Sequence, residues 1–301
     1  MKKQKVGFIG AGKVGTALAT TLFKGGYPVV AVANKNISAS EKLADLVPGC
    51  NVFKTAQEVA NTAEHVFITT PDDSILTVAS EITWRPEQNV VHCSGAASID
   101  ILEAAKISGA MVGSFHPCQA FASVDQAIKN LPGSTFAIEA QGSLLDILKE
   151  MASTIGCAWI VLKPGNKALY HVAAVFASNY FVTLLKVATD LFQNFDVSTA
   201  QSTKILMPLI QGNIKNINTI GLPSCLTGPI ARGDVSTIEK HIFALKEKKP
   251  SILKLYAELG LKTIPIALEK GTLDEKVSEA LQILLKKAID GGNDVSTLGK
   301  R

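Results

Sequence analysis

Three glycines near the start of the chain have the spacing of a loop that binds a diphosphate group. Gly10, Gly12 and Gly15 follow a short apolar run and precede an alanine-rich amphipathic segment, which predicts a strand, a glycine loop and a helix in that order. The first glycine permits a tight turn, the second lets a pyrophosphate approach the backbone, and the third lets the helix pack closely on the sheet. The helix N-terminus adds unpaired N–H groups and the positive end of the helix dipole. We therefore expect dinucleotide binding by Gly10, Ala11, Gly12, Lys13, Val14 and Gly15.

The end of the second expected strand, residues 29–33, indicates which dinucleotide binds. An acidic residue at this position binds the ribose hydroxyls of NAD in related loops, but here the strand is followed by Asn34, Lys35 and, a little later, Ser38. A carboxylate would repel a 2′-phosphate, whereas these side chains could donate hydrogen bonds to one. The sequence therefore favours NADP over NAD, with the alternative that Lys35 is an ordinary solvated loop lysine.

Small polar residues follow two further expected strands. Thr69, Thr70 and Pro71 come after the fourth strand, and Ser94 and Gly95 come after the fifth. In open α/β sheets ligands bind outside the carboxyl ends of the strands, so these residues are expected to contact the cofactor's riboses. Their alternative role is that of ordinary turn residues.

Strand and helix patterns alternate through the first half of the chain and then stop. The expected strands are residues 6–9, 29–33, 51–53, 65–69, 90–93, 111–114, 134–138 and 157–161. Near-continuous apolar strands that alternate with helices predict a mostly parallel sheet covered on both faces, the Rossmann type of α/β fold. Beyond Pro164 and Gly165 only helical patterns remain, the first being one long apolar helix over residues 166–195. We expect a cofactor-binding domain over residues 1–163 and an all-helical domain over residues 164–301.

Composition narrows the class of protein. The chain has 301 residues, of which 47% are hydrophobic, and a net charge of +4 without a basic run, so nucleic acid is an unfavourable partner. The five cysteines are scattered without a CxxC pair, which indicates reduced thiols in a cytoplasmic protein, and no His or Cys spacing suggests a metal site. The longest apolar stretch, Val172–Leu185, is shorter than the ~20 residues that span a bilayer, so a membrane is not expected. We expect the long helix to be buried in a large core or in an oligomer interface.

Five motifs together resemble a known family. They are Thr69–Asp73, His92–Ala96, Gly113–Pro117, Tyr170-His171 with Asn179-Tyr180, and Leu226–Asp234. The chain is similar to a bacterial family of Rossmann-like proteins whose C-terminal half is a domain of unknown function. That family resembles pyrroline-5-carboxylate reductase, ketopantoate reductase and the 6-phosphogluconate dehydrogenase superfamily. The resemblance implies an NADP-dependent oxidoreductase with an all-α C-terminal domain that forms a homodimer.

A reductase of this kind needs a proton donor that faces the nicotinamide. His116 lies just after a strand, and His171 lies in the first turns of the long helix, which carries a catalytic lysine and an asparagine in the related dehydrogenases. The free pKa of histidine, about 6.5, suits proton transfer at neutral pH. His171 and Ser178 fall within about 20° of each other around the helix, with Asn179 about 80° away. We expect His171 to act as general acid or substrate orienter, with Ser178 or Asn179 on the substrate. Three roles remain open for His116, namely catalysis, contact with the cofactor and a structural role.

The motif near residue 230 supplies the candidate substrate-binding residues Thr227 and Arg232, to which Tyr170 is added. Arg232 could bind a carboxylate or phosphate bidentately, across a dimer interface or otherwise, or it could pair with Asp234. Asp234 is expected to cap the following helix.

Two functions remain open on the sequence. The first is an NADP-dependent oxidoreductase that transfers a hydride between NADP(H) and a small polar, anionic substrate. The second is a sensor or regulator that binds NADPH without turnover. A polar cleft that His116 or His171 faces would favour the first, and a cleft filled by apolar side chains would favour the second.

Overall fold

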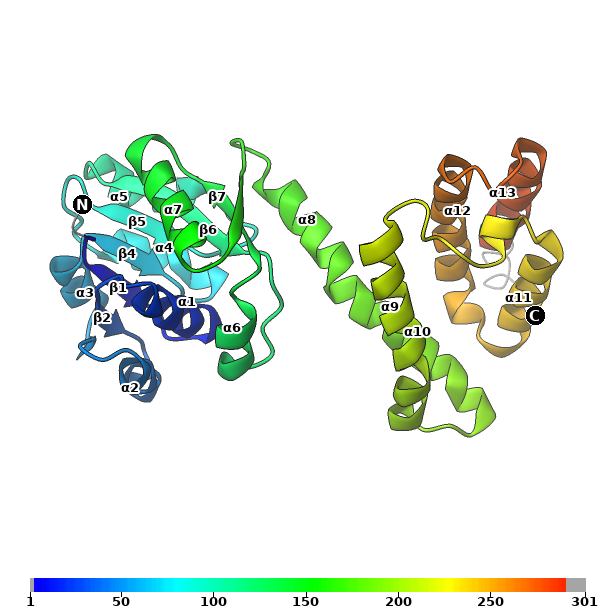
Figure 1. The fold of residues 1–301 in the computed structure, drawn as a ribbon, viewed down its shortest axis with the longest axis horizontal. Coiled ribbons are helices and arrows are strands. Elements are labelled where there is room, and N and C mark those ends of the chain that lie inside the picture. The colour runs from blue at the N-terminus through cyan, green and yellow to red at the C-terminus, as the bar shows by residue number, and fades with distance from the viewer. Residues whose placement is uncertain (1–2, 291–301) are drawn as a thin grey trace, which may run out of the picture. The chain divides into compact units, whose positions relative to one another are not determined.

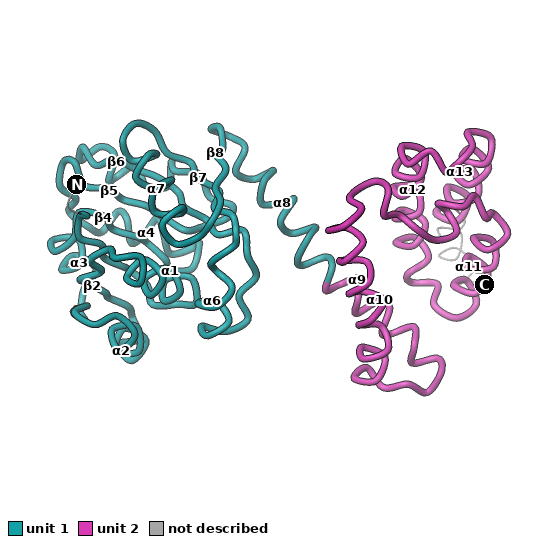
Figure 2. Tube along the Cα trace, viewed as in Figure 1, with its two compact units in different colours: residues 1–181 teal, residues 182–301 magenta. Residues whose placement is uncertain are grey.

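The computed structural model describes residues 3–290, and the chain divides into two compact units, Met1–Phe181 and Val182–Arg301 (Figure 2). Unit 1 holds every strand of the described chain, and unit 2 is helical. The predicted fold class, a mostly parallel α/β sheet followed by an all-helical region, is confirmed.

Unit 1 is built on an eight-stranded sheet (Figure 1). Its strands are β1 (Val6–Ile9), β2 (Val29–Ala33), β3 (Asn51–Phe53), β4 (His65–Ile68), β5 (Asn89–His92), β6 (Met111–Pro117), β7 (Thr135–Glu139) and β8 (Ala158–Val161). They lie in the order β3-β2-β1-β4-β5-β6-β7-β8, and every neighbouring pair is parallel except β6 with β7. The strand order reverses between β1 and β4, which is where an open α/β sheet forms its ligand crevice.

Helices cover both faces of this sheet. They are α1 (Lys13–Lys24), α2 (Ile37–Leu46), α3 (Ala56–Thr62), α4 (Asp72–Glu81), α5 (Glu103–Ile107), α6 (Val124–Asn130) and α7 (Gly142–Thr154), with the 3-10 turn η1 (Ile99–Leu102) before α5. Buried residues of α1, α2, α6 and α7 form one apolar core on one face, and those of α3, α4 and α5 form a second core on the other. Because side chains alternate along a strand, this two-sided burial explains why the central strands β1, β4 and β5 read as continuous apolar runs, whereas the edge strand β8 is exposed.

A row of phenylalanine rings fixes the first of these cores. Phe8 stacks on Phe67 with ring centroids 5.3 Å apart, Phe67 lies 6.1 Å from Phe115, and Phe115 stacks on Phe136 at 3.8 Å. All four rings are fully buried. Because Phe115 points to this face, its strand neighbours Ser114 and His116 point to the other face of the sheet.

Unit 2 carries a separate helical core. Its elements are α9 (Asn179–Phe192, which begins in unit 1), η2 (Gln193–Phe195), α10 (Thr199–Ile220), η3 (Ile230–Arg232), α11 (Val235–Lys248), η4 (Pro250–Ile252), α12 (Leu253–Glu269) and α13 (Glu275–Asp290). Leu253, Ile264, Leu281 and Leu285 are among the buried residues that join α11, α12 and α13. The Ser198/Gln201 capping box starts α10 and the Asp234 carboxylate caps α11, as expected for Asp234.

The long apolar helix differs in two ways from the expected single helix in a large core. It is divided at Ser178 into α8 (Lys167–Ala177) and α9. Ser178 stays in the helical region of backbone space, with its N–H on the Ala174 carbonyl oxygen, but its φ of −114° and ψ of −71° depart from regular helix values. It is also largely exposed within the chain, since only 6% of its most apolar 18-residue window is buried. Lys167–Phe195 is the one helical stretch within residues 3–290 that is long and apolar enough to cross a membrane by length and composition.

Candidate active site

The glycine loop joins β1 to α1 at the crevice between β1 and β4. Gly10 has φ +108°, which only glycine adopts easily, and a Cβ at Gly15 would lie 2.4 Å from Thr69 Oγ1 and 2.5 Å from the Gly10 carbonyl oxygen. The Thr69 hydroxyl donates to that same carbonyl at 2.7 Å. Gly10 and Gly15 therefore permit the turn and the close helix packing that hold the loop against β4.

The N-terminus of α1 is left open to a ligand. Gly12 is the N-cap residue and has no side chain, so no side chain caps the first turn, and a Cβ built on Gly12 would meet no atom within 4 Å. The first N–H groups of a helix have no partner within the helix. This end of α1 therefore offers N–H groups and a positive dipole to an anion.

Asn34 supports the loop. Its Oδ1 accepts a hydrogen bond from the Ala11 N–H at 3.3 Å, and its Nδ2 donates to the Asn36 carbonyl oxygen at 3.0 Å. The side chains of Lys35 and Ser38 are exposed, and Lys35 makes no hydrogen bond or ion pair within residues 3–290. Of the three residues expected near a 2′-phosphate, Lys35 is thus the freest to move.

The loops after β4 and β5 are tied together. The Ser94 hydroxyl donates to Asp72 Oδ2 at 2.6 Å and accepts from the N–H groups of Ala96 and Ala97. Thr70 Oγ1 is buried without a hydrogen-bond partner. An orphaned hydroxyl beside the loop is a group that a ligand could satisfy.

A row of three buried polar side chains crosses the neighbouring strands. His92 of β5 is in register with Ser114 of β6, which is in register with Glu139 of β7. Their exposed fractions are 0%, 0% and 3%. His92 Nδ1 accepts from the Ser94 N–H and Nε2 donates to the Ser98 carbonyl oxygen, a pattern that only the neutral imidazole can make. Burial, first, and the charge of Lys167, second, lower the pKa of His92 to about 3.

Lys167, in the first turn of α8, completes this row. It is 2% exposed and its Nζ donates to the Ser114 hydroxyl. Burial lowers the pKa of Lys167 to about 8, while the carboxylate of Glu139 favours its charged form. Burial raises the pKa of Glu139, and Lys167 opposes that shift. The sheet therefore holds a buried ammonium group that is still protonated at neutral pH.

The same turn of α8 brings both candidate histidines together. The hydroxyl of Tyr170 lies 2.9 Å from His116 Nδ1, and the rings of His116 and His171 stand edge to face with centroids 6.1 Å apart. A Cβ on Gly95 would lie 2.6 Å from His171 Nδ1 and 2.8 Å from His116 Nε2. Gly95 therefore lets two imidazoles approach the loop after β5. His171 Nδ1 is buried and has no hydrogen-bond partner.

The protonation of this cluster follows from its surroundings. Burial, together with the charges of Lys167 and His171, lowers the pKa of His116 to about 4, so His116 is neutral at pH 7. Burial raises the pKa of Tyr170, so its hydroxyl keeps its proton and can donate to His116 Nδ1. With Nδ1 as acceptor, the ring proton sits on Nε2, next to Gly95. His116 is then a hydrogen-bond donor rather than a cationic acid.

The other expected site residues lie elsewhere. Ser178 is seven residues beyond His171, about 10 Å along the helix axis, and no hydrogen bond within residues 3–290 joins the two. Asn179 begins α9. Thr227 and Arg232 belong to unit 2, where they line a pocket of about 280 Å³. Within residues 3–290, no group of three or more His, Cys, Asp or Glu side chains could hold a metal ion.

Sequence reasoning did not find Lys167 or Glu139. Lys167 precedes Tyr170 by three residues and His171 by four, which places the three residues on one face of the helix. A lysine on this face was the sequence signal that could have indicated its role. Glu139 stands at the end of a buried strand, and nothing local in the sequence marks its partner.

Two regions of the chain match models of known protein families. Residues 1–117 match the model of a Rossmann-like domain, and residues 134–263 match a domain of unknown function, DUF2520. The chain joins a Rossmann-like domain to a DUF2520 domain. The expected resemblance is therefore confirmed. No curated protein matches the chain.

Solved structures similar to this protein cover most of its length. Protein TM1727 from Thermotoga maritima is 26% identical with a TM-score of 0.71, and the alignment covers 87% of this chain and 99% of that one. A Bacteroides fragilis protein, described provisionally as an NADP oxidoreductase, is 24% identical with a TM-score of 0.68, covering 87% and 98%. A reductive aminase from Aspergillus terreus, in complex with NADPH and ethyl-5-oxohexanoate, is 16% identical with a TM-score of 0.61, covering 97% and 95%.

The charge of Lys167 should affect the titration of the neighbouring histidines. Replacing Lys167 with Met keeps the length of the side chain and removes the positive charge beside His116 and His92. The pKa of His116 should then rise from about 4, because its charged form loses a repulsive neighbour. NMR titration of the histidine ring protons measures it. Lys163→Met, at an exposed position just before α8, is the control and should leave the value unchanged. An unchanged pKa in Lys167→Met would contradict the described cluster.

Proposed function

We propose that this protein is an NADP-dependent oxidoreductase that reduces a carbon–oxygen or carbon–nitrogen double bond in a small polar, anionic substrate. The observation that carries the proposal is the meeting of His116, Tyr170 and His171 over Gly95, at the loop after β5. A polar, partly exposed face of this kind favours turnover over the alternative of a sensor, for which apolar filling was expected.

The glycine loop fits a dinucleotide. The uncapped N-terminus of α1, the open space at Gly12 and the orphaned hydroxyl of Thr70 are the features of unit 1 that support it. Gly10–Gly15 would hold the diphosphate, Thr69, Thr70, Pro71, Ser94 and Gly95 would lie along the riboses, and Lys35 with Ser38 would meet the 2′-phosphate. NADPH, when bound, supplies the hydride. The solved structures with a related fold include complexes with NADPH, which supports this choice of cofactor.

The two histidines would have different roles. His171 Nδ1, which has no partner in the described chain, is the atom placed to give a proton to the reduced oxygen or nitrogen. His116, held neutral and oriented by Tyr170, would donate a hydrogen bond from Nε2 to the same group and polarise it. Tyr170 then acts on the substrate through His116. Reductive aminases and imine reductases among the structures of similar fold act on double bonds of this class, which supports the choice of reaction.

Cofactor preference tests the assignment of the glycine loop. NADPH should bind about tenfold more tightly than NADH, since a charge-assisted hydrogen bond contributes about 1.5–3 kcal/mol and 1.4 kcal/mol is tenfold. Lys35→Asp should remove this preference by replacing attraction with repulsion. Fluorescence titration with each nucleotide measures the ratio of the two affinities. Lys42→Asp, on helix α2 just after Lys35, makes the same change of charge and is the control. Equal affinities in the unmodified protein would contradict the proposal.

Removal of the proton donor tests the chemistry. Once a carbonyl or imine substrate has been found by following NADPH oxidation, His171→Ala should lower kcat by about 10²–10⁴, the usual contribution of a positioned acid. The affinity for NADPH should stay within a few-fold, because the histidine lies beyond the glycine loop. A His171→Ala protein with full turnover would refute the assigned role.

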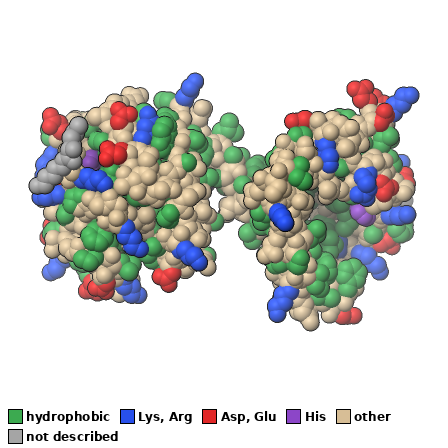
Figure 3. Space-filling model, viewed as in Figure 1, with side chains coloured by type: hydrophobic (Ala, Val, Ile, Leu, Met, Phe, Trp, Pro, Cys, Tyr) green, Lys and Arg blue, Asp and Glu red, His purple; other side chains and the backbone are tan. Residues whose placement is uncertain are grey.

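We further propose that the protein is a soluble, cytoplasmic homodimer that associates through its helical part. The side chains of Phe176, Val182, Leu209 and Ile220 on α8, α9 and α10 are 59–64% exposed. Hydrophobic side chains also line a hollow in unit 2 (Figure 3). Exposed apolar surface of this extent is typical of a subunit interface.

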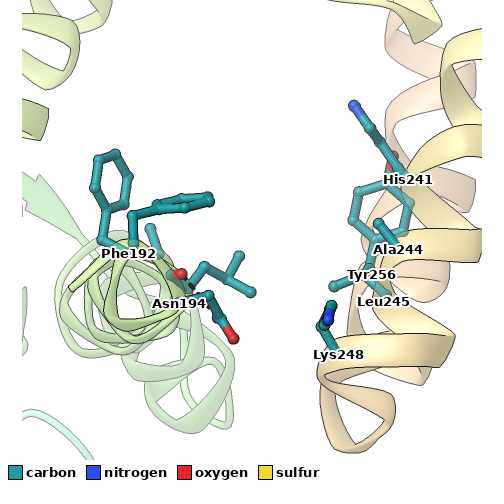
Figure 4. A pocket seen from close by; sticks show the side chains of 10 residues that line it. Phe192, Asn194, His241, Ala244, Leu245, Lys248 and Tyr256 are labelled. Carbon is teal, nitrogen blue, oxygen red and sulfur yellow. Dashed lines mark hydrogen bonds between the residues drawn. The ribbon is translucent and has the colours of Figure 1, made fainter. Parts of the chain in front are cut away.

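The hollow is a pocket of about 700 Å³ within unit 2. Figure 4 shows Phe192 and Asn194 on one wall, facing Leu245, Lys248 and Tyr256 on the other. It could receive apolar side chains of a second copy of the chain. A second copy would cover the exposed helices. This would explain why the apolar stretch Lys167–Phe195 is exposed within a single chain.

Sedimentation analysis tests the dimer. The full chain should sediment at twice its mass, and Leu209→Glu should shift the protein toward monomer because a charge would have to be buried at the interface. Leu76→Glu, at a position 57% exposed on α4 of unit 1, should leave the dimer intact. A monomeric unmodified protein at micromolar concentration would exclude the proposal.

A further inference from the structure

We propose that the small pocket of unit 2 around Arg232 and Lys270 binds a doubly charged oxyanion, with a phosphate group as its preferred occupant. The pocket has a volume of about 280 Å³ and is lined by Leu226, Thr227, Gly228, Ala231, Arg232, Lys270 and Thr272. That volume is roughly nine times the ~30 Å³ that one water molecule occupies in the liquid, which is enough for a phosphate and the first atoms attached to it.

The lining combines two cations with two hydroxyl groups and no carboxylate. Lys270 is held in place because its Nζ donates to the Leu226 carbonyl oxygen at 2.7 Å, and an ammonium group has two further protons to donate. Thr227 and Thr272 are exposed at the mouth of the pocket. Two positive charges match a dianion, and hydroxyl groups supply the remaining donors.

The guanidinium group of Arg232 is not used by the protein. The nearest acid along the chain, Asp234, is committed to the start of α11, where it accepts from the Thr237 N–H, the Thr237 hydroxyl and the Ser236 hydroxyl. Within residues 3–290, Arg232 has no carboxylate oxygen within 4.0 Å. The sequence left open an ion pair with Asp234. The guanidinium group makes no such direct contact, although its charge helps to lower the pKa of Asp234, so its five donors are available to an anion.

The pocket stands on a rigid base. Ile230 and Ala231, next to Arg232, are 8% and 4% exposed, and Ile230 belongs to the core of unit 2. Gly233 has φ +66°, and a Cβ there would lie 2.9 Å from Val277 of α13, so the backbone after Arg232 is pressed against that helix. A fixed backbone means that little ordering is required when an anion binds.

All the residues of this pocket belong to unit 2, so we propose it as an anion site of that unit by itself. The binding itself does not depend on turnover. A phosphate is favoured over a dicarboxylate because a tetrahedral dianion presents several acceptor oxygens to Arg232, Lys270 and the hydroxyl groups together.

Titration of the full-length protein with inorganic phosphate, followed by NMR of the Thr227 and Thr272 amide signals, tests the inference. We expect saturable shifts of these signals, weakened about tenfold in Arg232→Ala and in Lys270→Ala, since each removes a charge-assisted hydrogen bond. Lys262→Ala, an exposed lysine of α12 outside the pocket, is the matched control and should leave the affinity unchanged. Raising the ionic strength should weaken binding.

The outcomes separate this inference from the proposed function. No phosphate shift at Thr227 and Thr272, or equal affinity in the two variants and the control, overturns the pocket even if the protein oxidises NADPH. Saturable binding that depends on Arg232 and Lys270 supports the pocket even if no redox activity is found. Tighter binding of succinate than of phosphate overturns the preference for a phosphate.

Discussion

The first turn of α8 is fixed by a buried ammonium group, and the site of unit 1 depends on that contact. An ammonium group inside a protein costs several kcal/mol unless charged and hydrogen-bonding partners surround it. Lys167 finds them in the hydroxyl of Ser114 and in the nearby acidic groups, of which Glu139 has the largest effect, where β6 and β7 run side by side. A helix held at residue 167 has little freedom to rotate, so the residues three and four positions further on face the same strands. The position of Tyr170 over His116, and of His171 beside Gly95, follows from where one lysine can be buried.

The polar row also explains why His116 stays neutral. The charge that fixes α8 lies in the same region as the imidazole, so the contact that orients the ring also opposes its protonation. His92, which is fully buried, is kept neutral by the same burial and charge and shapes the loop that carries Ser94 and Gly95. Burial, first, and the charge of Lys167, second, thus keep both imidazoles neutral, and the same lysine holds α8 on the sheet.

Much of the fold could be predicted from the sequence because its signals are local. The glycine loop, the buried strands and the cap at Asp234 are each encoded within a few residues, and the structure has them where they were expected. The break at Ser178 could not be predicted, since serine is tolerated inside helices and the apolar pattern continues past it. Lys167, Ser114 and Glu139 meet where the strand direction reverses between β6 and β7, and no local pattern reports such a pairing. The contact of Asn34 with the Ala11 N–H, which supports the glycine loop, joins two loops and could not be predicted from a local pattern either.

The antiparallel pairing of β6 with β7 has a consequence for the order in which unit 1 can fold. The loop from Gly10 to Gly15 needs its own strand, its own helix and the neighbouring strands β2 and β4. The polar row draws on residues from His92 to Lys167, so β5, β6, β7 and the connection to α8 must all be in place before the ammonium group has partners. Closing long loops costs entropy that only later contacts offset. We therefore expect the nucleotide loop to be an early part of folding and the histidine cluster a late one.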